Sequence, residues 1–286
     1  MPDIPILVRS AQNADLARMM RMRQHARRVV MHFGQEDLQQ MIAQGGCVVA
    51  EAETLLWGFA CAARQQPGLA ILRGLGLLNG WRIDDGLVQL LRPLEASLRA
   101  RGHQHLMHLA IDGWLAAPLA RQRFINHDYI VHFERATPPS PTLPIFVLPD
   151  VNLRILAQQE IDRLVALDHQ AFDWPWQFSR GELIKWLMTA DRLVVLEHQK
   201  QLVGYACVQV HGEEAHLVRL AIAPGWQGQG FGRYLLADAL DFSAARGAAT
   251  ITLNTQWHNT ASQRLYKGFG FRAIGRRIPV LLKELV

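Results

Sequence analysis

The chain carries five prolines between residues 136 and 150, in the segment ATPPSPTLPIFVLPD, near the middle of its 286 residues. Proline lacks a backbone N–H and fixes φ, so such a segment favours an extended connector over a helix or a central strand. Each flanking part has the length of an ordinary domain. We therefore predict a first domain over residues 1–136, a linker over residues 137–149 and a second domain over residues 150–286.

The two flanking parts share one order of predicted elements. In residues 150–286, alternating and helical apolar patterns indicate a strand, two helices, a hairpin, a strand, a helix, a strand, a short helix and closing strands. The first part repeats this order, and a repeat of about 145 residues is far longer than those of solenoid proteins. The sequence therefore predicts an α/β (α+β) protein with two copies of one fold, each a mixed, mostly antiparallel sheet flanked by helices.

Composition narrows the class of protein further. Half of the residues are apolar and 19% are charged, which is typical of a globular chain. No apolar run approaches the ~18 residues that span a bilayer, and the N-terminus lacks the pattern of a signal peptide. We therefore expect a cytoplasmic protein without a membrane partner. The cysteines lie in apolar strand-like runs, which indicates core residues rather than metal ligands or a disulfide framework: Cys47, Cys61 and Cys207.

The formal net charge of +5 raises the question of nucleic-acid binding. The densest basic run, residues 18–28, has the pattern of the solvated face of an amphipathic helix, so nucleic acid is not the favoured partner. In the segment HQHLMH, strand alternation would place His103 and His105 on one face and His108 on the other, and no acidic or cysteine residue is near them in the sequence. We therefore predict no metal site.

Three closely spaced glycines mark the segment APGWQGQGFGRYLLADAL, residues 223–240, between a predicted strand and a predicted helix. Glycines let successive amides point inward, and a helix N-terminus adds partial positive charge, so this segment predicts an anion site. It lacks the Lys-Ser/Thr of a Walker loop and the register of a Rossmann loop. The predicted phosphate-binding residues are Gln227, Gly228, Gln229, Gly230, Phe231, Gly232 and Arg233.

The glycine segment resembles the acetyl-coenzyme A signature of the GNAT superfamily of N-acetyltransferases, which Gln227, Gly230 and Gly232 match. A second segment, NTASQRLYKGFGF at residues 259–271, resembles the other signature of that family. The resemblance covers residues 151–281. It implies tandem GNAT-like domains, acetyl-CoA as the cofactor, and direct transfer of an acetyl group to a primary amine of a small molecule or peptide within a ternary complex.

The resemblance also implies roles for single residues. The backbone of Leu220, Ala221 and Ile222 would bind the pantetheine arm. Asn259 and Ser262 would contact its pantetheine and phosphate region. Tyr266 would stand near the thioester sulfur, and a phenol with a reference pKa of ~10 suits the protonation of a departing thiolate.

The general base and the acceptor site are less defined by the sequence. The segments AFDWPW and EEAHLVRLAIAP resemble the ribosomal-protein alanine N-acetyltransferase branch, which keeps a glutamate at the position of Asn254. Asparagine cannot act as a base, so Glu214 or His216 is the substitute, unless the amine arrives neutral. The predicted acceptor-binding residues are Phe172, Trp174, Trp176 and Asn254.

The first part of the chain carries NGWRIDDG where the glycine loop should be, and Asp84 and Asp85 would oppose a bound anion there. We therefore predict that residues 1–136 form a GNAT-like domain without a cofactor site. Two alternatives to an enzyme stay open: an acyl-CoA sensor without turnover, and a protein that docks on RNA or the ribosome through its arginine-rich first half. The amine acceptor and the oligomeric state are not predicted.

Overall fold

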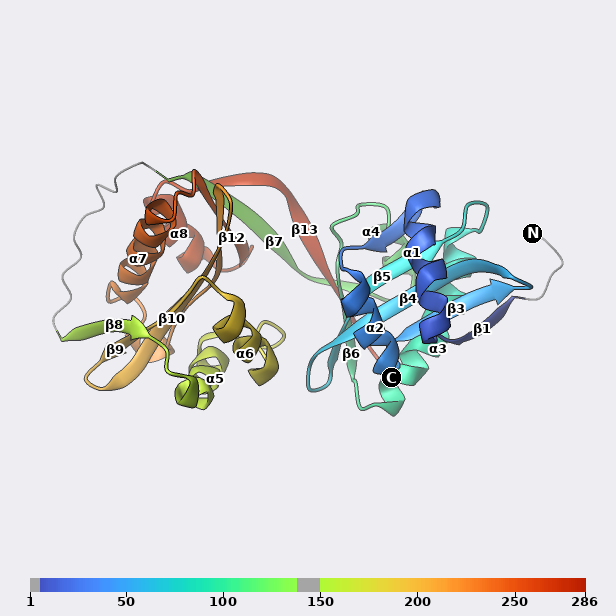
Figure 1. Ribbon diagram of the computed structural model, residues 1–286, viewed down its shortest axis with the longest axis horizontal. Helices are drawn as coiled ribbons and strands as arrows, with labels where there is room; N and C mark the ends of the chain where they lie inside the picture. Colours follow the sequence, from blue (N-terminus) through green and yellow to red (C-terminus); the bar gives the residue numbers. More distant parts are fainter. Residues whose placement is uncertain (1–5, 138–149) are drawn as a thin grey trace. The chain divides into compact units, whose positions relative to one another are not determined.

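The computed structural model describes residues 6–137 and 150–286, and its helices and strands form two compact units (Figure 1). Unit 1 comprises Met1–Tyr129 and Ile278–Val286, and unit 2 comprises Ile130–Arg277. Nearly all of the linker predicted over residues 137–149 lies outside the described residues. Each unit combines helices with a mixed sheet, which confirms the predicted fold class.

Unit 1 has the strand order β1-β3-β4-β5-β6-β13, with β2 paired to β5. The β5·β6 pairing is parallel, whereas β3·β4 and β4·β5 are antiparallel. Alternate residues of a strand face opposite sides, so Val48 packs with α3 while Val49 packs with α1 and α2. The elements are β1 (Leu7–Ser10), α1 (Leu16–His25), β2 (Arg28–Met31), α2 (Gln35–Ala43), β3 (Cys47–Ala52), β4 (Leu55–Gln66), β5 (Leu69–Leu77), α3 (Ile83–Ala100), β6 (His105–Leu109) and α4 (Ala116–Arg121).

Unit 2 has the strand order β7-β12-β11-β10-β9-β8, in which β11·β12 is parallel and β10·β11 is antiparallel. Val194 packs with α7 on one face, and Val195 packs with α5 and α6 on the other. The elements are β8 (Val151–Ile155), α5 (Ile161–Ala171), α6 (Arg180–Thr189), β9 (Arg192–His198), β10 (Gln201–His211), β11 (Glu214–Ile222), α7 (Phe231–Ala245), β12 (Thr250–Gln256) and α8 (Thr260–Gly268).

The two halves of the chain exchange strands. β7 (Ile125–Ala136) pairs with β12 through residues 130–136, and β13 (Arg272–Glu284) pairs with β6 through residues 280–284. The observed units therefore differ from the predicted boundaries at 136 and 150, because residues 130–136 belong to unit 2 and residues 278–286 to unit 1. Strand partners so distant in the sequence leave no local pattern, so the sequence could not indicate the exchange.

Each unit has a short stretch of parallel strand pairing, and the two units differ in what lies beside the strand where this pairing ends. In unit 2, β11 pairs with β12 only over Glu214–Leu217, so within the described chain no β12 residue pairs with residues 218–222. In unit 1, β5 pairs with β6 only over Leu69–Ile71, and β2 then pairs with residues 74–77 of β5. Unit 2 thus keeps an open strand edge at the position where unit 1 has an added strand.

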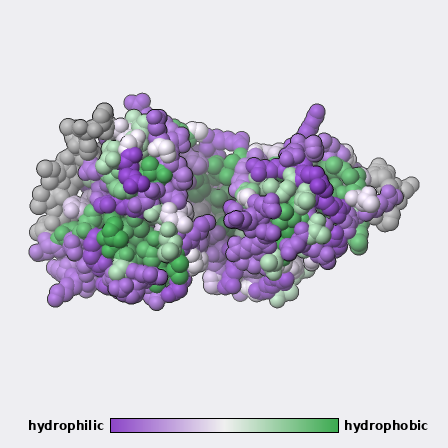
Figure 2. Space-filling model, viewed as in Figure 1, coloured by the Kyte–Doolittle hydropathy of each residue, from purple (hydrophilic) through white to green (hydrophobic). Residues whose placement is uncertain are grey.

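Both units present a mostly hydrophilic surface on the face shown in Figure 2, with apolar residues gathered in smaller areas. Among the residues described, none of the helices has the length and apolar character needed to cross a membrane. Within residues 6–137 and 150–286, no group of three or more His, Cys, Asp or Glu side chains is placed to hold a metal ion.

Replacing Leu281 with alanine should destabilise unit 1 by about 2–5 kcal/mol, the usual cost of truncating a buried leucine. Leu281 is 5% exposed and packs in the core of unit 1, although it follows unit 2 in the sequence. Amide hydrogen exchange of β6 measures the effect. The control is Ile274→Ala on the same strand, at a position that is 40% exposed. Unchanged protection of β6 in Leu281→Ala would contradict the strand exchange.

Candidate active site

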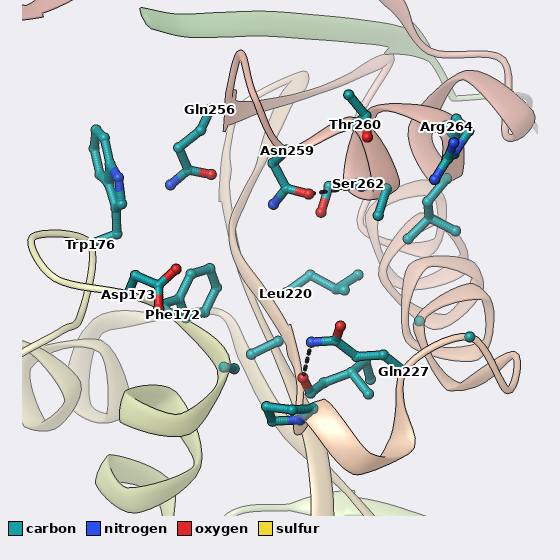
Figure 3. Close-up of a pocket in the computed structure, with 18 of the residues that line it drawn as sticks. Phe172, Asp173, Trp176, Leu220, Gln227, Gln256, Asn259, Thr260, Ser262 and Arg264 are labelled. Carbon is teal, nitrogen blue, oxygen red and sulfur yellow. Dashed lines mark hydrogen bonds between the residues drawn. The ribbon is translucent and has the colours of Figure 1, made fainter. Parts of the chain in front are cut away.

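A cavity of about 720 Å³ opens in unit 2 beside the unpaired edge of β11 (Figure 3). Its floor includes Leu220, Ala221 and Ile222. The glycine loop and the first turn of α8 form one side, and the segment after α5 forms the other. In Figure 3, Trp176 and Gln256 lie on one side of Leu220, and Thr260 and Arg264 lie on the other. The cavity thus joins segments that the sequence analysis assigned to cofactor and acceptor.

The glycine loop has a backbone that favours glycine. Gly228 and Gly230 have φ values of 76° and 94°, in the left-handed region that costs other residues about 1–2 kcal/mol. Gly230 caps the N-terminus of α7, whose amides are therefore directed toward the cavity that Gly228, Gly230 and Gly232 line. Gln227 Nε2 donates a 3.0 Å hydrogen bond to the carbonyl of Ile222, which fixes the loop to the end of β11 (Figure 3).

Two of the predicted loop residues are not among those that line the cavity. Phe231 is buried, and its ring packs against Trp226 and His198. Gln229 Nε2 donates to the carbonyl of Gly225, within the loop itself. The cavity is lined instead by the glycines together with Gln227 and Arg233.

The first turn of α8 supplies the opposite wall. Asn259 caps this helix by accepting a 3.0 Å hydrogen bond from the amide of Ser262, and both residues line the cavity. Tyr266 lies one turn further, buried against Phe133 and Phe271. Tyr266 does not line the cavity itself. Its side chain is hydrogen-bonded to Ser262, which does line the cavity. Burial raises the pKa of the Tyr266 hydroxyl to about 12, so the phenol keeps its proton at neutral pH.

A buried ion pair holds the segment after α5 in place. Arg219, on β11, donates to the carboxylate of Asp168 at 2.7 Å, and Asp168 is fully buried on α5. The same carboxylate accepts from the amide of Phe178 at 2.7 Å and from the hydroxyl of Tyr205. Asp168 therefore ties α5, β10 and β11 to the loop between α5 and α6.

The guanidinium of Arg219 also contacts that loop directly. It donates to the carbonyl of Trp176 at 2.7 Å. Its central carbon lies 3.5 Å from the ring centroid of Phe172 and 4.0 Å from that of Phe178, an arrangement in which cation–π attraction adds to the ion pair. Sequence reasoning missed this residue, although an arginine inside the apolar strand segment LVRLAI was a signal that it has a buried partner.

The sequence of unit 2 is similar to known acetyltransferases. The model of the acetyltransferase (GNAT) family matches residues 161–271. The [ribosomal protein bS18]-alanine N-acetyltransferase of Haemophilus ducreyi is 30% identical over 122 residues, which cover 43% of this chain and 83% of that protein. The corresponding enzyme of Haemophilus influenzae is 32% identical over 123 residues, covering 41% and 79%. The chain belongs to the GNAT family of N-acetyltransferases.

Solved GNAT structures also resemble the whole chain. A GCN5-related N-acetyltransferase from Sphaerobacter thermophilus has a TM-score of 0.66 at 16% identity, covering 99% of this chain and 97% of that one. A tandem GNAT protein from the clavulanic acid biosynthesis pathway has a TM-score of 0.66 at 13% identity, covering 99% of each chain. These likenesses concern the fold, and they confirm the predicted tandem GNAT architecture.

Only some of the residues predicted to bind the acceptor line the cavity of this GNAT protein. Phe172 and Trp176 line the cavity. Trp174 is 37% exposed and lies outside the residues that line it. The lining residues Gln170, Asp173, Gln256 and His258 were not singled out from the sequence, because their segments carry no pattern beyond that of a loop or strand end.

The predicted bases lie at some distance from the cavity. Glu214 begins β11, six residues before Leu220 and therefore roughly 20 Å away along the strand. His216 is half-buried, and its Nδ1 is 2.9 Å from Thr252 Oγ1. Asn254 is exposed on β12, and neither it nor the two candidate bases is among the residues that line the cavity.

Replacing Arg219 with methionine should lower the free energy of unfolding by about 3–5 kcal/mol, because the carboxylate of Asp168 is left buried without its charge partner. Urea denaturation measures the change. The matched control is Arg180→Met, which removes an arginine–aspartate pair whose side chains are 56% and 76% exposed. That substitution should cost less than about 1 kcal/mol. Equal losses in the two variants would show that the buried pair does not stabilise the loop.

Proposed function

We propose that unit 2 binds acetyl-CoA along the open edge of β11 and transfers the acetyl group to a primary amine of a small molecule or a peptide. One observation carries the proposal: an unpaired strand edge, a left-handed glycine loop at a helix N-terminus and an aromatic wall share a single cavity. Each part matches one portion of the two reactants.

The cavity residues fit acetyl-CoA by their chemistry. Backbone groups of Leu220–Ile222 can pair with the amides of the pantetheine arm, as an added strand would. The amides of the glycine loop and the N-terminus of α7 suit the pyrophosphate, and Arg233 adds a positive charge at the same wall. A volume of about 720 Å³ is within the range of small-molecule sites.

The protein's own groups then serve the transfer. When bound, acetyl-CoA supplies an acetyl group activated as a thioester. Backbone amides at the open edge of β11 are fixed donors that can stabilise negative charge developing on a carbonyl oxygen. Tyr266 holds a proton at its hydroxyl, and Ser262 connects that hydroxyl to the cavity.

Direct transfer to the amine is favoured over an acyl-cysteine route. The lining of the cavity contains no cysteine among the described residues, and Cys207 is buried in the core between β10 and α5. Burial raises the pKa of its thiol to about 12, so a nucleophilic thiolate does not form there near neutral pH. The amine acceptor would therefore react within a ternary complex.

The acceptor wall favours an amine that arrives with a positive charge or an aromatic group. Phe172 and Trp176 line the cavity, and the carboxylate of Asp173 lies beside Phe172 (Figure 3). The relatives in Haemophilus are named [ribosomal protein bS18]-alanine N-acetyltransferases, so we include a peptide that begins with alanine as one candidate acceptor. Asn254 stands at the position where that branch is expected to have a glutamate, so a small-molecule amine is an equally good candidate acceptor.

Unit 1 is proposed to be a GNAT-like domain without a cofactor site. The edge of β5 that corresponds to the open edge of β11 is paired with β2 over residues 74–77. Asp84 and Asp85 lie in the first turn of α3, where a phosphate would need positive charge, and Asp84 pairs with Arg121 at 2.9 Å. Strand pairing and charge thus both disfavour acetyl-CoA in unit 1.

Replacing Gly228 with aspartate should raise the Kd of coenzyme A by about tenfold or more, which corresponds to ~1.4 kcal/mol. Aspartate tolerates the left-handed conformation, so its charge opposes the phosphates without much backbone strain. Isothermal titration calorimetry measures the Kd. Gly228→Asn carries the same bulk without charge and should change the Kd by less than about threefold.

The matched control for the glycine loop is Gly212→Asp in the turn between β10 and β11. Gly212 has a φ of 60° and, like Gly228, no atom within 4 Å of an added Cβ. Coenzyme A should bind this variant as it binds the unaltered protein. Equal weakening by Gly228→Asp and Gly212→Asp would argue against a phosphate site in the loop.

Replacing Tyr266 with phenylalanine should lower kcat by about 100-fold while the Kd of coenzyme A changes less than twofold, since only the proton donor is lost. Thiol release is followed with acetyl-CoA and three amines: tryptamine, putrescine and a peptide that begins with alanine. Turnover of none of these by the unaltered protein, with tight binding of acetyl-CoA, would favour a sensor. An unchanged kcat in Tyr266→Phe would exclude Tyr266 as the acid.

A further inference from the structure

A row of polar side chains runs along β12 away from the cavity. Ile251, Leu253 and Thr255 are buried on one face of this strand, so the alternate residues face the other side. Those alternate residues are Thr252, Asn254 and Gln256, and Gln256 lines the cavity. The row therefore starts at the acceptor wall of the site.

Two histidines flank this row, one from each neighbouring strand. His132 on β7 lies directly opposite Asn254, and their side chains are hydrogen-bonded. His216 on β11 contacts Thr252, one step further from the cavity. Side chains diagonal to each other across a strand pair have Cα atoms about 7–8 Å apart, which is the relation of His132 to Gln256. His132 is not among the described residues that line the cavity, and it adjoins the cavity wall through its diagonal neighbour Gln256.

The surroundings of His132 favour its neutral form. Burial lowers the pKa of its imidazole, and the hydrogen bond with Asn254 opposes this only in part. Burial also lowers the pKa of His216, and the proximity of His132 lowers it further. Glu134 lies two residues away on β7, opposite Thr252, and the unit 2 part of the neighbouring strand β13 carries Arg272, Arg276 and Arg277.

We infer that His132 is the general base of unit 2 and takes the proton from the nitrogen of the amine acceptor. This inference rests on the proposed function. As the new C–N bond forms and the C–S bond breaks, an amine N–H bond breaks and its proton passes to the neutral imidazole, which becomes imidazolium and later releases the proton to water. Tyr266 supplies the separate proton for the sulfur and afterwards regains a proton from water. Asn254 holds the His132 ring in place.

Other titratable groups are less suited to this role. Glu214 lies too far along β11, and His216 contacts the distant end of the polar row. His258 lines the cavity but directly precedes Asn259, the cap of α8 on the cofactor side. Asp173 is an exposed carboxylate that lines the cavity, where its negative charge suits attraction of a cationic amine.

The test measures kcat/KM against pH in the full chain, with acetyl-CoA and two amines of different pKa, tryptamine and a peptide that begins with alanine. A base must be neutral, so the rate should fall as pH drops through the pKa of His132, at the same pH for both amines. In His132→Gln this fall at low pH, the acid limb of the profile, should vanish, and kcat/KM at pH 7 should fall about 100-fold. The KM for acetyl-CoA should change less than twofold.

The control is His211→Gln, which removes an exposed histidine at the end of β10 and should leave the profile unchanged. NMR titration of the His132 ring in the unaltered protein gives a second readout that needs no turnover. Its pKa should lie below the ordinary ~6.5 and agree with the kinetic limb. A difference of more than about one unit would contradict the assignment.

The outcomes separate this inference from the proposed function. If the unaltered protein shows no turnover, the proposed function fails as well. If it turns over and His132→Gln keeps the limb and the rate, the inference alone is overturned. Loss of the limb in Asp173→Asn or His258→Gln, with the limb retained in His132→Gln, would move the base to that residue and also overturn it.

Discussion

The unpaired edge of β11 beyond Leu217 is the constraint on which the site depends. Backbone donors and acceptors along a strand need partners, and an open edge attracts whatever can supply them. In unit 1 the corresponding edge of β5 is paired within the protein, because β2 pairs with its residues 74–77. In unit 2 the edge faces a cavity, so a ligand with amides of its own can take that place. The two units thus share a fold and differ in one strand edge, which β2 pairs in unit 1 and which is open in unit 2.

The loop beside this edge is held by a buried ion pair. The Arg219–Asp168 pair contacts the segment from Phe172 to Phe178 through hydrogen bonds to the amide of Phe178 and the carbonyl of Trp176. Burying both charges carries a desolvation cost. Hydrogen bonds from Tyr205 and the amide of Phe178, and the two aromatic rings over the guanidinium, offset that cost. The acceptor wall is therefore positioned by the strand that also forms the floor of the cavity.

Local features of this site could be predicted from the sequence, whereas distant pairings could not. The glycines at 228 and 230 signal left-handed backbone, and the spacing from Asn259 to Tyr266 places a cap and a phenol on one short helix. Arg219 and Asp168 are 51 residues apart, and only the fold brings them together. Likewise, the exchange of β7 and β13 moved both domain boundaries, because a strand's partner is set by tertiary packing. Sequence reasoning sought the base near the signatures, in the second half alone, and so did not consider His132.

The strand exchange gives the first half a role that does not require a cofactor site. Without residues 130–136, β12 would lose its antiparallel partner, and the polar row that leads from Gln256 would lose His132. Without residues 278–286, β6 would be left as an exposed edge and the core of unit 1 would lose Leu281. Each half therefore stabilises the sheet of the other. The sheet that carries the cavity of unit 2 therefore depends on the first half of the chain, because β7 supplies the antiparallel partner of β12.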